Sequence, residues 1–236
     1  MGKQRPCLAG LMAATGVIAM YRGRFRPWMY TWGAGADEAA AVLPGDDLVT
    51  AGVPRTTRAV TVDAPRRAVW PWLAQIGEGR AGFYSYALLE RALGARIHNA
   101  NRIHPEWQDL QVGDTVWLAR RYGAHARQVV ALVEPKAHLV LMSPGDFERV
   151  QRGEKASWAW GFHLKPSNGR TRMIARTAGA PVGYALFDIA HFIMEYGMMC
   201  GIRERAQRTA RAEYEQYRVF SAPAPQNLAS VTTISL

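Results

Sequence analysis

The chain has 236 residues, of which 49% are apolar and 20% charged, and this composition excludes disordered, collagen-like and coiled-coil proteins. The length predicts one domain with a sizeable core, alone or with a short appendage. Cys7 and Cys200 are too few for a disulfide scaffold or a cysteine-based zinc site. The net charge of +10 would suit nucleic acid or an anionic membrane, but the arginines are scattered and no nucleic-acid-binding motif is found, so no nucleic-acid partner is expected.

An uncharged, mostly apolar stretch occupies residues 7–21, with basic residues on both sides. It is shorter than the roughly 20 residues that a bilayer span needs. Residues 34–36 (Ala-Gly-Ala) would match a signal-peptide cleavage site. However, three arginines lie between the apolar stretch and that site, which argues against export. Two interpretations of this hydrophobic N-terminal segment, residues 1–26, stay open: it contacts a membrane, or it is a helix packed on the protein. The protein is expected to be cytoplasmic, with association to a membrane as an open alternative.

The first regular elements follow an irregular stretch. Residues 56–62 alternate and are rich in β-formers, which predicts a strand. Pro65 then favours the start of a helix, whose apolar residues recur at helical spacing up to Ile76. Pro71 should kink this helix. A second short helix is predicted over residues 85–93.

A run of antiparallel strands is predicted next. Its members are residues 114–119, 127–133, 137–142, 156–165 and 170–177. Asn168-Gly169 indicates a hairpin turn between the last two. Arg170, Arg172 and Arg176 share one face of the last strand, which predicts that one side of the sheet is exposed to water.

One long helix is predicted from residue 181 to about residue 218. A twisted antiparallel sheet must bury its concave face, and this helix is the element available to cover it. We therefore expect an α+β helix-grip fold over residues 27–220, in which a curved antiparallel sheet wraps around a long C-terminal helix. Residues 221–236 are polar and contain prolines, so a disordered tail is expected there.

Short motifs spread over residues 28–210 carry a family resemblance. They are Trp32-Gly33-Ala34, Leu43-Pro44-Gly45-Asp46, Val69-Trp70-Pro71-Trp72-Leu73, Gly82-Phe83-Tyr84-Ser85-Tyr86, Pro105-Glu106-Trp107, Phe192-Ile193-Met194-Glu195 and Gly201-Ile202-Arg203. Together they resemble the SRPBCC superfamily of START, polyketide-cyclase and birch-pollen-allergen proteins, in a largely uncharacterised bacterial subfamily. The resemblance implies an internal cavity for lipids, polyketides or other apolar molecules, and no single reaction. Ala87 and Asn101 depart from it, since the family often has Asp at both positions.

The densest polar cluster lies between residues 98 and 107, where the predicted fold places the mouth of a pocket. His98 or His104 could act as a general base there, with Glu106 orienting it and Asn99 or Asn101 donating to a substrate oxygen. The alternative is a structural loop. The spacing matches no helical ligand pattern, and no metal is expected.

His191 and Glu195 are four residues apart on the long helix, which makes them a second catalytic candidate or a surface pair of little energy. Gly197 in the same helix indicates a close approach by a strand or a ligand. Aromatic and methionine side chains suit the wall of an apolar pocket, although plain core packing explains each of them as well. The candidates are Trp107, Trp117, Trp158, Trp160, Phe162, Met173, Met194 and Met198.

The leading interpretation is a protein that binds a polyketide- or lipid-like molecule and catalyses a cofactor-free cyclisation or dehydration with a histidine base, as in natural-product biosynthesis. The alternative is a non-catalytic carrier or sensor of lipid-like ligands, held at a membrane by residues 7–21. An apolar small molecule is the expected partner in both, and no cofactor is expected. The sequence does not determine the oligomeric state.

Overall fold

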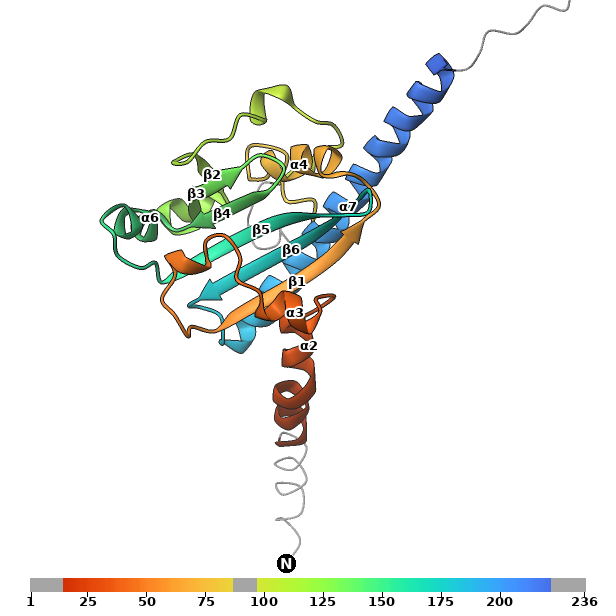
Figure 1. Ribbon diagram of the computed structural model, residues 1–236. Helices are drawn as coiled ribbons and strands as arrows, with labels where there is room; N and C mark the ends of the chain where they lie inside the picture. The colour runs from red at the N-terminus through yellow and green to blue at the C-terminus, as the bar shows by residue number, and fades with distance from the viewer. Residues whose placement is uncertain (1–14, 87–96, 222–236) are drawn as a thin grey trace, which may run out of the picture.

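The computed structural model describes residues 15–86 and 97–221, and Figure 1 shows its architecture. Six antiparallel strands form one curved sheet in the order β1-β6-β5-β4-β3-β2, and the long helix α7 (Ala185–Ser221) lies along its inner face. This confirms the α+β helix-grip fold. The strands are β1 (Arg55–Val62), β2 (Thr115–Trp117), β3 (Arg127–Glu134), β4 (His138–Met142), β5 (Trp158–Ser167) and β6 (Arg170–Gly179). The helix expected over residues 85–93 and the tail expected over residues 221–236 lie mostly outside the described residues, and Ser221 is the last residue of α7.

The main core lies between the inner face of the sheet, α7 and α4 (Arg66–Ala74). Residues two apart on a strand share a face, so Trp160, Phe162 and Leu164 of β5 all point into this core. On α7, Met198 and Met199 pack against them. The apolar stripe predicted for α4 is buried there as well, with Pro71 inside the helix and Pro65 just before it.

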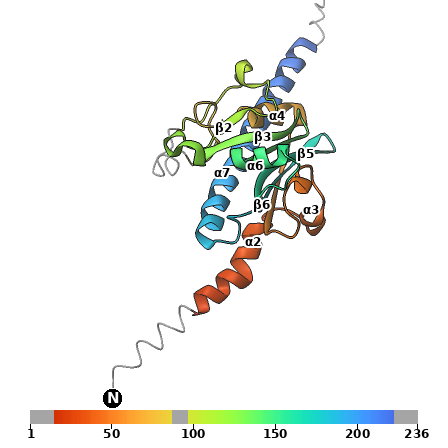
Figure 2. The same cartoon turned by 90° about the vertical axis from the view of Figure 1, so that its left-hand side faces the viewer.

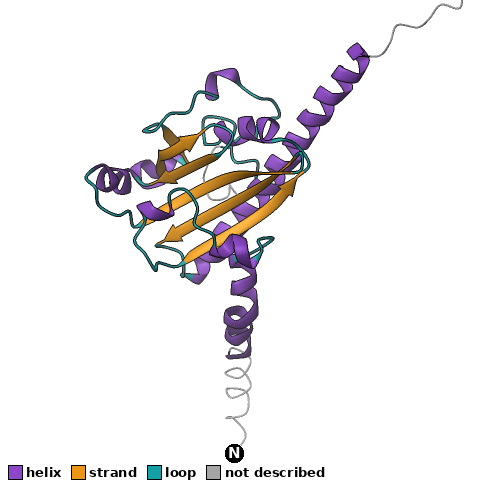
Figure 3. Ribbon diagram, in the orientation of Figure 1, coloured by secondary structure: helices purple, strands orange, loops and turns teal. Residues whose placement is uncertain are grey.

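The outer face of the sheet is covered, which corrects the prediction of a wet side. The covering segment, residues 33–49, contains α3 (Ala36–Ala40) and the short 3-10 helix η2 (Asp46–Leu48), while α6 (Pro144–Gln151) covers the other end (Figure 3). Arg176 is only 3% exposed because its guanidinium donates to the carbonyl oxygens of Glu38, Ala39 and Ala41. Alternation along a strand cannot reveal that a distant segment will satisfy such an arginine.

The N-terminal helical segment projects from the body in both views (Figures 1 and 2). It runs through the π-helical turn η1 (Tyr21–Phe25) into α2 (Arg26–Tyr30), and residues 15–20 are helical too. The helix α2 is tied to α7 through a ring contact of 5.1 Å between Trp28 and Phe192, an ion pair of 3.5 Å between Arg26 and Asp188, and a hydrogen bond of 2.7 Å from the Tyr30 hydroxyl to Asp188. Residues 15–20 are exposed, so this part of the apolar stretch is not packed on the protein.

One helix in the described part of the chain, α7, is long and apolar enough to pass a test for membrane spans. Nearly half of its most apolar window (44%) is buried against the rest of the protein, as expected of a core helix. The helix is therefore no sign of a membrane-spanning protein.

Two glycines of α7, Gly197 and Gly201, allow another segment of the chain to approach the helix closely, as expected from Gly197 in the sequence. A Cβ added to Gly197 would lie 2.7 Å from Ser85 Oγ, and one added to Gly201 would overlap the backbone carbonyl of Tyr84. The approaching segment is the loop that contains residues 84–86, neither a strand nor a ligand. These two glycines let the loop cross directly over the helix.

Candidate functional site

A cavity of about 350 Å³ lies between α7, the inner face of the sheet and η4 (Arg120–Ala126). Its walls are almost wholly apolar. They consist of Phe83, Ile97, Leu118, Ala119, Tyr122, Ala126, Trp158, Trp160, Phe187, Ala190, His191, Met194, Glu195 and Met198. Tyr122 and Ala190 are exposed to solvent, so the cavity opens between η4 and the first turns of α7.

Periodicity explains how α7 and β5 supply the walls. Phe187, His191, Met194 and Met198 recur at helical spacing and form one stripe of α7 that faces the cavity. Trp158 and Trp160 face it from β5. These side chains do not fill the space between α7 and the sheet, so an apolar cavity remains that is open at one side.

A buried polar cluster borders this apolar space. Arg58 of β1 and Glu195 of α7 form an ion pair of 2.7 Å in which neither side chain is exposed. The indole Nε1 of Trp160 donates to the other carboxylate oxygen at 2.6 Å, and Arg58 Nε donates to the Met29 carbonyl at 2.7 Å. Burial raises the pKa of Glu195, but the charge of Arg58 and the two donated hydrogen bonds outweigh it and lower the pKa, so the carboxylate stays ionised.

His191 sits between this cluster and the cavity. Its Nδ1 is 3.1 Å from Arg58 Nη1, and a guanidinium can only donate, so Nδ1 accepts and the neutral ring carries its proton on Nε2. Burial, together with the Arg58 charge, lowers the pKa of His191 despite the nearby carboxylate, which keeps the ring neutral. Nε2 lies 3.7 Å from Glu195, and no hydrogen-bond partner for it is found among the described residues. The indole Nε1 of Trp158, another cavity-wall residue, likewise has no partner among the described residues, so two N–H groups of the walls are unpartnered.

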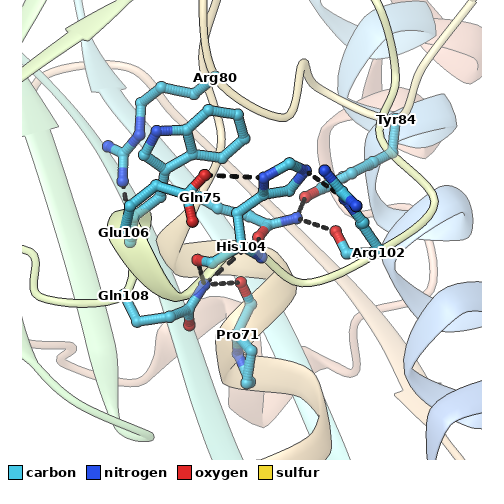
Figure 4. A network of polar contacts seen from close by, with 9 residues as sticks. Pro71, Gln75, Arg80, Tyr84, Arg102, His104, Glu106 and Gln108 are labelled. Atoms are coloured by element: carbon cyan, nitrogen blue, oxygen red, sulfur yellow. Dashed lines mark hydrogen bonds and ion pairs between the residues drawn. The ribbon is translucent and has the colours of Figure 1, made fainter.

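The polar cluster of residues 98–107 lies elsewhere, because none of its side chains lines the cavity. The Nδ1 atom of His104 lies 3.0 Å from Glu106 Oε1, as Figure 4 shows. The imidazole ring of His104 stacks on the Trp107 ring. The expected pair therefore forms, but on the protein surface. Gln75 holds it there by accepting the backbone N–H of His104 and donating to the Arg102 carbonyl.

The other polar residues of this segment are bound to the protein itself. Asn99 accepts the backbone N–H of Tyr84 at 2.7 Å and donates to the Ser85 carbonyl at 3.0 Å, while Asn101 accepts from Arg205. His98 is exposed. The amides of Asn99 and Asn101 thus hold the loop at residues 84–85 and the helix α7, and neither side chain lines the cavity.

The expected pocket walls divide into two groups. Trp158, Trp160, Met194, Met198 and Glu195 line the cavity. Phe162 and Met173 are buried deeper in the core, and Trp107 and Trp117 lie outside the lining. Sequence reasoning missed Arg58, whose place in the inward-facing row of β1 with Val60 and Val62 was a signal that could have been noticed. It also missed other wall residues, such as Phe83, Leu118 and Ala190.

No group of three or more potential metal ligands occurs in the described ranges, residues 15–86 and 97–221. No known family model and no curated protein sequence matches this chain. Solved structures are similar in fold. Protein MLL2253 from Mesorhizobium loti has a TM-score of 0.41 at 13% identity, covering 66% of this chain and 98% of its own. CalC from Micromonospora echinospora, described as a self-sacrificing resistance protein, has a TM-score of 0.39 at 14% identity, covering 68% and 96%. At these identities and TM-scores the similarity supports no conclusion about the activity of this chain.

Proposed function

We propose that this chain binds an apolar small molecule, bearing a hydrogen-bond acceptor, in the cavity under α7, and that it is a member of the SRPBCC superfamily. The volume of about 350 Å³ falls in the range of ligand pockets, and the aromatic and methionine walls suit a flat or flexible apolar molecule. The observation that carries the proposal is the unpartnered Nε2–H of His191, since a buried donor is costly until an acceptor reaches it.

The chemistry of the donor sets the ligand class. A neutral N–H group pairs with a carbonyl, ether or hydroxyl oxygen, so we propose a ligand that places such an oxygen near His191 and its hydrocarbon part against Trp158, Trp160 and Met194. The ionised Glu195 nearby disfavours a carboxylate at the same point.

The polar groups of the cavity favour binding without turnover, as in a carrier or sensor. A histidine-catalysed cyclisation or dehydration needs a free base, whereas Nδ1 of His191 accepts from Arg58 and Nε2 carries the proton. Glu195 is engaged by Arg58 and Trp160. His98 and His104, the other bases proposed from the sequence, do not line the cavity.

The test uses Nile red, an apolar dye with a carbonyl group, and pyrene, a hydrocarbon without one. Ala190→Trp should fill the mouth and abolish binding of both, whereas Ala212→Trp, the same change on an exposed part of α7, should leave both unchanged. His191→Leu should weaken Nile red by roughly 2- to 10-fold, the value of one neutral hydrogen bond, and spare pyrene. Unchanged affinities in Ala190→Trp would refute the cavity as the binding site.

A further inference from the structure

One face of the N-terminal helical segment carries an exposed apolar stripe. Ile18, Tyr21, Phe25 and Trp28 follow one another at spacings of three and four residues, which places them on one side of a helix. Ile18 is 54% exposed, and Phe25 and Trp28 are about half exposed. Ring contacts join Tyr21 to Phe25 at 6.3 Å and Phe25 to Trp28 at 5.5 Å. The stripe is therefore continuous and largely uncovered within the described part of the chain.

The stripe reaches the body of the protein beside the cavity mouth. Trp28 packs edge-on against Phe192 of α7. The next residue, Ile193, forms a second exposed row with Leu186 and Ala190, at spacings of four and three residues along the helix. Leu186 is 83% exposed, and Ala190 lines the cavity. Apolar surface thus extends from the projecting segment to the rim of the cavity.

Positive charge accompanies this apolar surface. Arg22 and Arg24 are exposed and make no ion pair with the described residues, whereas Arg26 is paired with Asp188. The first acidic residue of the sequence is Asp37, so every charge before it is positive. Exposed apolar side chains with arginines beside them are the pattern by which helices bind anionic lipid surfaces. A second copy of the same segment would bring like charges together, which disfavours self-association through this face.

We propose that the segment of residues 15–30 docks on an anionic lipid surface, with Ile18, Phe25 and Trp28 among the acyl chains and Arg22 and Arg24 at the headgroups. The docked segment holds the row of Leu186 and Ile193, and with it the cavity mouth, near the bilayer. If the cavity binds an apolar ligand, as proposed above, this position would let the ligand pass between the bilayer and the cavity. The docking of the segment on lipid does not depend on the proposed function.

The test is flotation of the full chain with vesicles of phosphatidylcholine alone and of phosphatidylcholine mixed with phosphatidylglycerol. The wild type should float with the mixed vesicles and much less with the neutral ones. Arg22→Glu/Arg24→Glu should lower the partition coefficient by about tenfold or more. The matched control is Arg211→Glu/Arg218→Glu, an equal change of charge on exposed residues of the far end of α7, and it should retain most of the binding. Ile18→Ser/Phe25→Ser tests the apolar part and should also lower the partition coefficient.

Three results would overturn the docking proposal. The first is equal flotation of the wild type and Arg22→Glu/Arg24→Glu, and the second is equal binding to neutral and mixed vesicles. The third is a dimer in sedimentation with no binding to vesicles, which would assign the surface to a second copy. Nile red binding without vesicles reports on the cavity alone. Failure of docking and failure of ligand binding are therefore distinguishable in the same set of variants, and thermal unfolding verifies that each variant is folded.

Discussion

The guanidinium of Arg58 and the carboxylate of Glu195 meet at 2.7 Å although the two residues are 137 positions apart in the chain. Neither side chain is exposed. The pair joins the edge strand β1 to α7, and Arg58 also holds the carbonyl of Met29 at the end of the N-terminal helical segment. The same arginine fixes the tautomer of His191. One buried ion pair therefore links the sheet, both helical segments and His191, whose Nε2 is one of two unpartnered N–H groups among the described cavity-wall residues.

Removing one member of this pair should destabilise the protein more than removing both. Arg58→Met and Glu195→Gln should each lower the free energy of unfolding by about 3–5 kcal/mol, because each leaves a buried group without its partner. The double variant should recover part of that loss. Urea unfolding measures all three. Arg67→Ala, which breaks the exposed pair with Glu213, should cost less than about 1 kcal/mol. Strict additivity of the two single losses would contradict the coupling.

His163 should make the protein sensitive to acid. Burial, with help from the charges of His138, Arg176 and Lys165, lowers its pKa from 6.5 to about 3. His163 is therefore protonated below about pH 6.5 in the unfolded chain, but only below about pH 3 in the folded protein. The stability attached to neutral His163 is fully present above pH 6.5 and is lost as the pH falls toward 3, at about 1.4 kcal/mol per pH unit.

The corresponding measurement compares urea unfolding at several pH values between 3 and 7 for the wild type and His163→Leu. The plot of unfolding free energy against pH should be steeper for the wild type than for His163→Leu, by a difference approaching about 1.4 kcal/mol per pH unit. His98→Gln, which changes an exposed histidine, should follow the wild type. Parallel curves for the wild type and His163→Leu would rule out His163 as the source of acid sensitivity.

Gly201→Ala should destabilise the protein strongly. The added methyl would overlap the backbone carbonyl of Tyr84, and a backbone atom cannot move aside without shifting the loop. We expect a loss of about 2 kcal/mol or more. Gly16→Ala is the matched control, since it is a helical glycine with open space around it, and it should be neutral or gain up to about 1 kcal/mol. Equal melting temperatures for the two variants would contradict the close approach.

Arg176→Lys should loosen the segment that covers the outer face of the sheet. A lysine ammonium cannot reproduce the fork that reaches the carbonyls of Glu38, Ala39 and Ala41 at once. We expect a loss of about 2–4 kcal/mol and faster amide exchange around residues 38–49. Arg170→Lys changes an exposed arginine on the same face and should have little effect. Unchanged exchange in Arg176→Lys would mean that other contacts hold the segment.

Periodicity made most of the fold predictable. Alternation over residues 156–165 matches β5, and the long apolar pattern after residue 181 matches α7. The helix α6 was missed although its capping was visible in the sequence. Ser143 accepts the backbone N–H of Asp146, and Pro144 occupies the first helical position. The helix is hard to recognise from periodicity because it spans only eight residues, of which Phe147 and Val150 are the large apolar ones.

The candidate site was predictable where it lies on one regular element. His191, Met194, Glu195 and Met198 could be placed on one side of a helix before the structure was known. The position of residues 98–107 could not, because Gln75 fixes it from a different helix end through hydrogen bonds that leave no periodic pattern. Arg58 shows the same limit, since only the folded sheet brings it to Glu195.

The order of the sheet has a consequence for biosynthesis. β1 is the first strand to leave the ribosome, and its only neighbour in the sheet is β6, the last one. At translation speeds of about 5–20 residues per second, β1 waits for roughly 6 to 23 s with an unpaired edge. The edge of β1 is thus open to pairing with other extended segments until the final strand emerges.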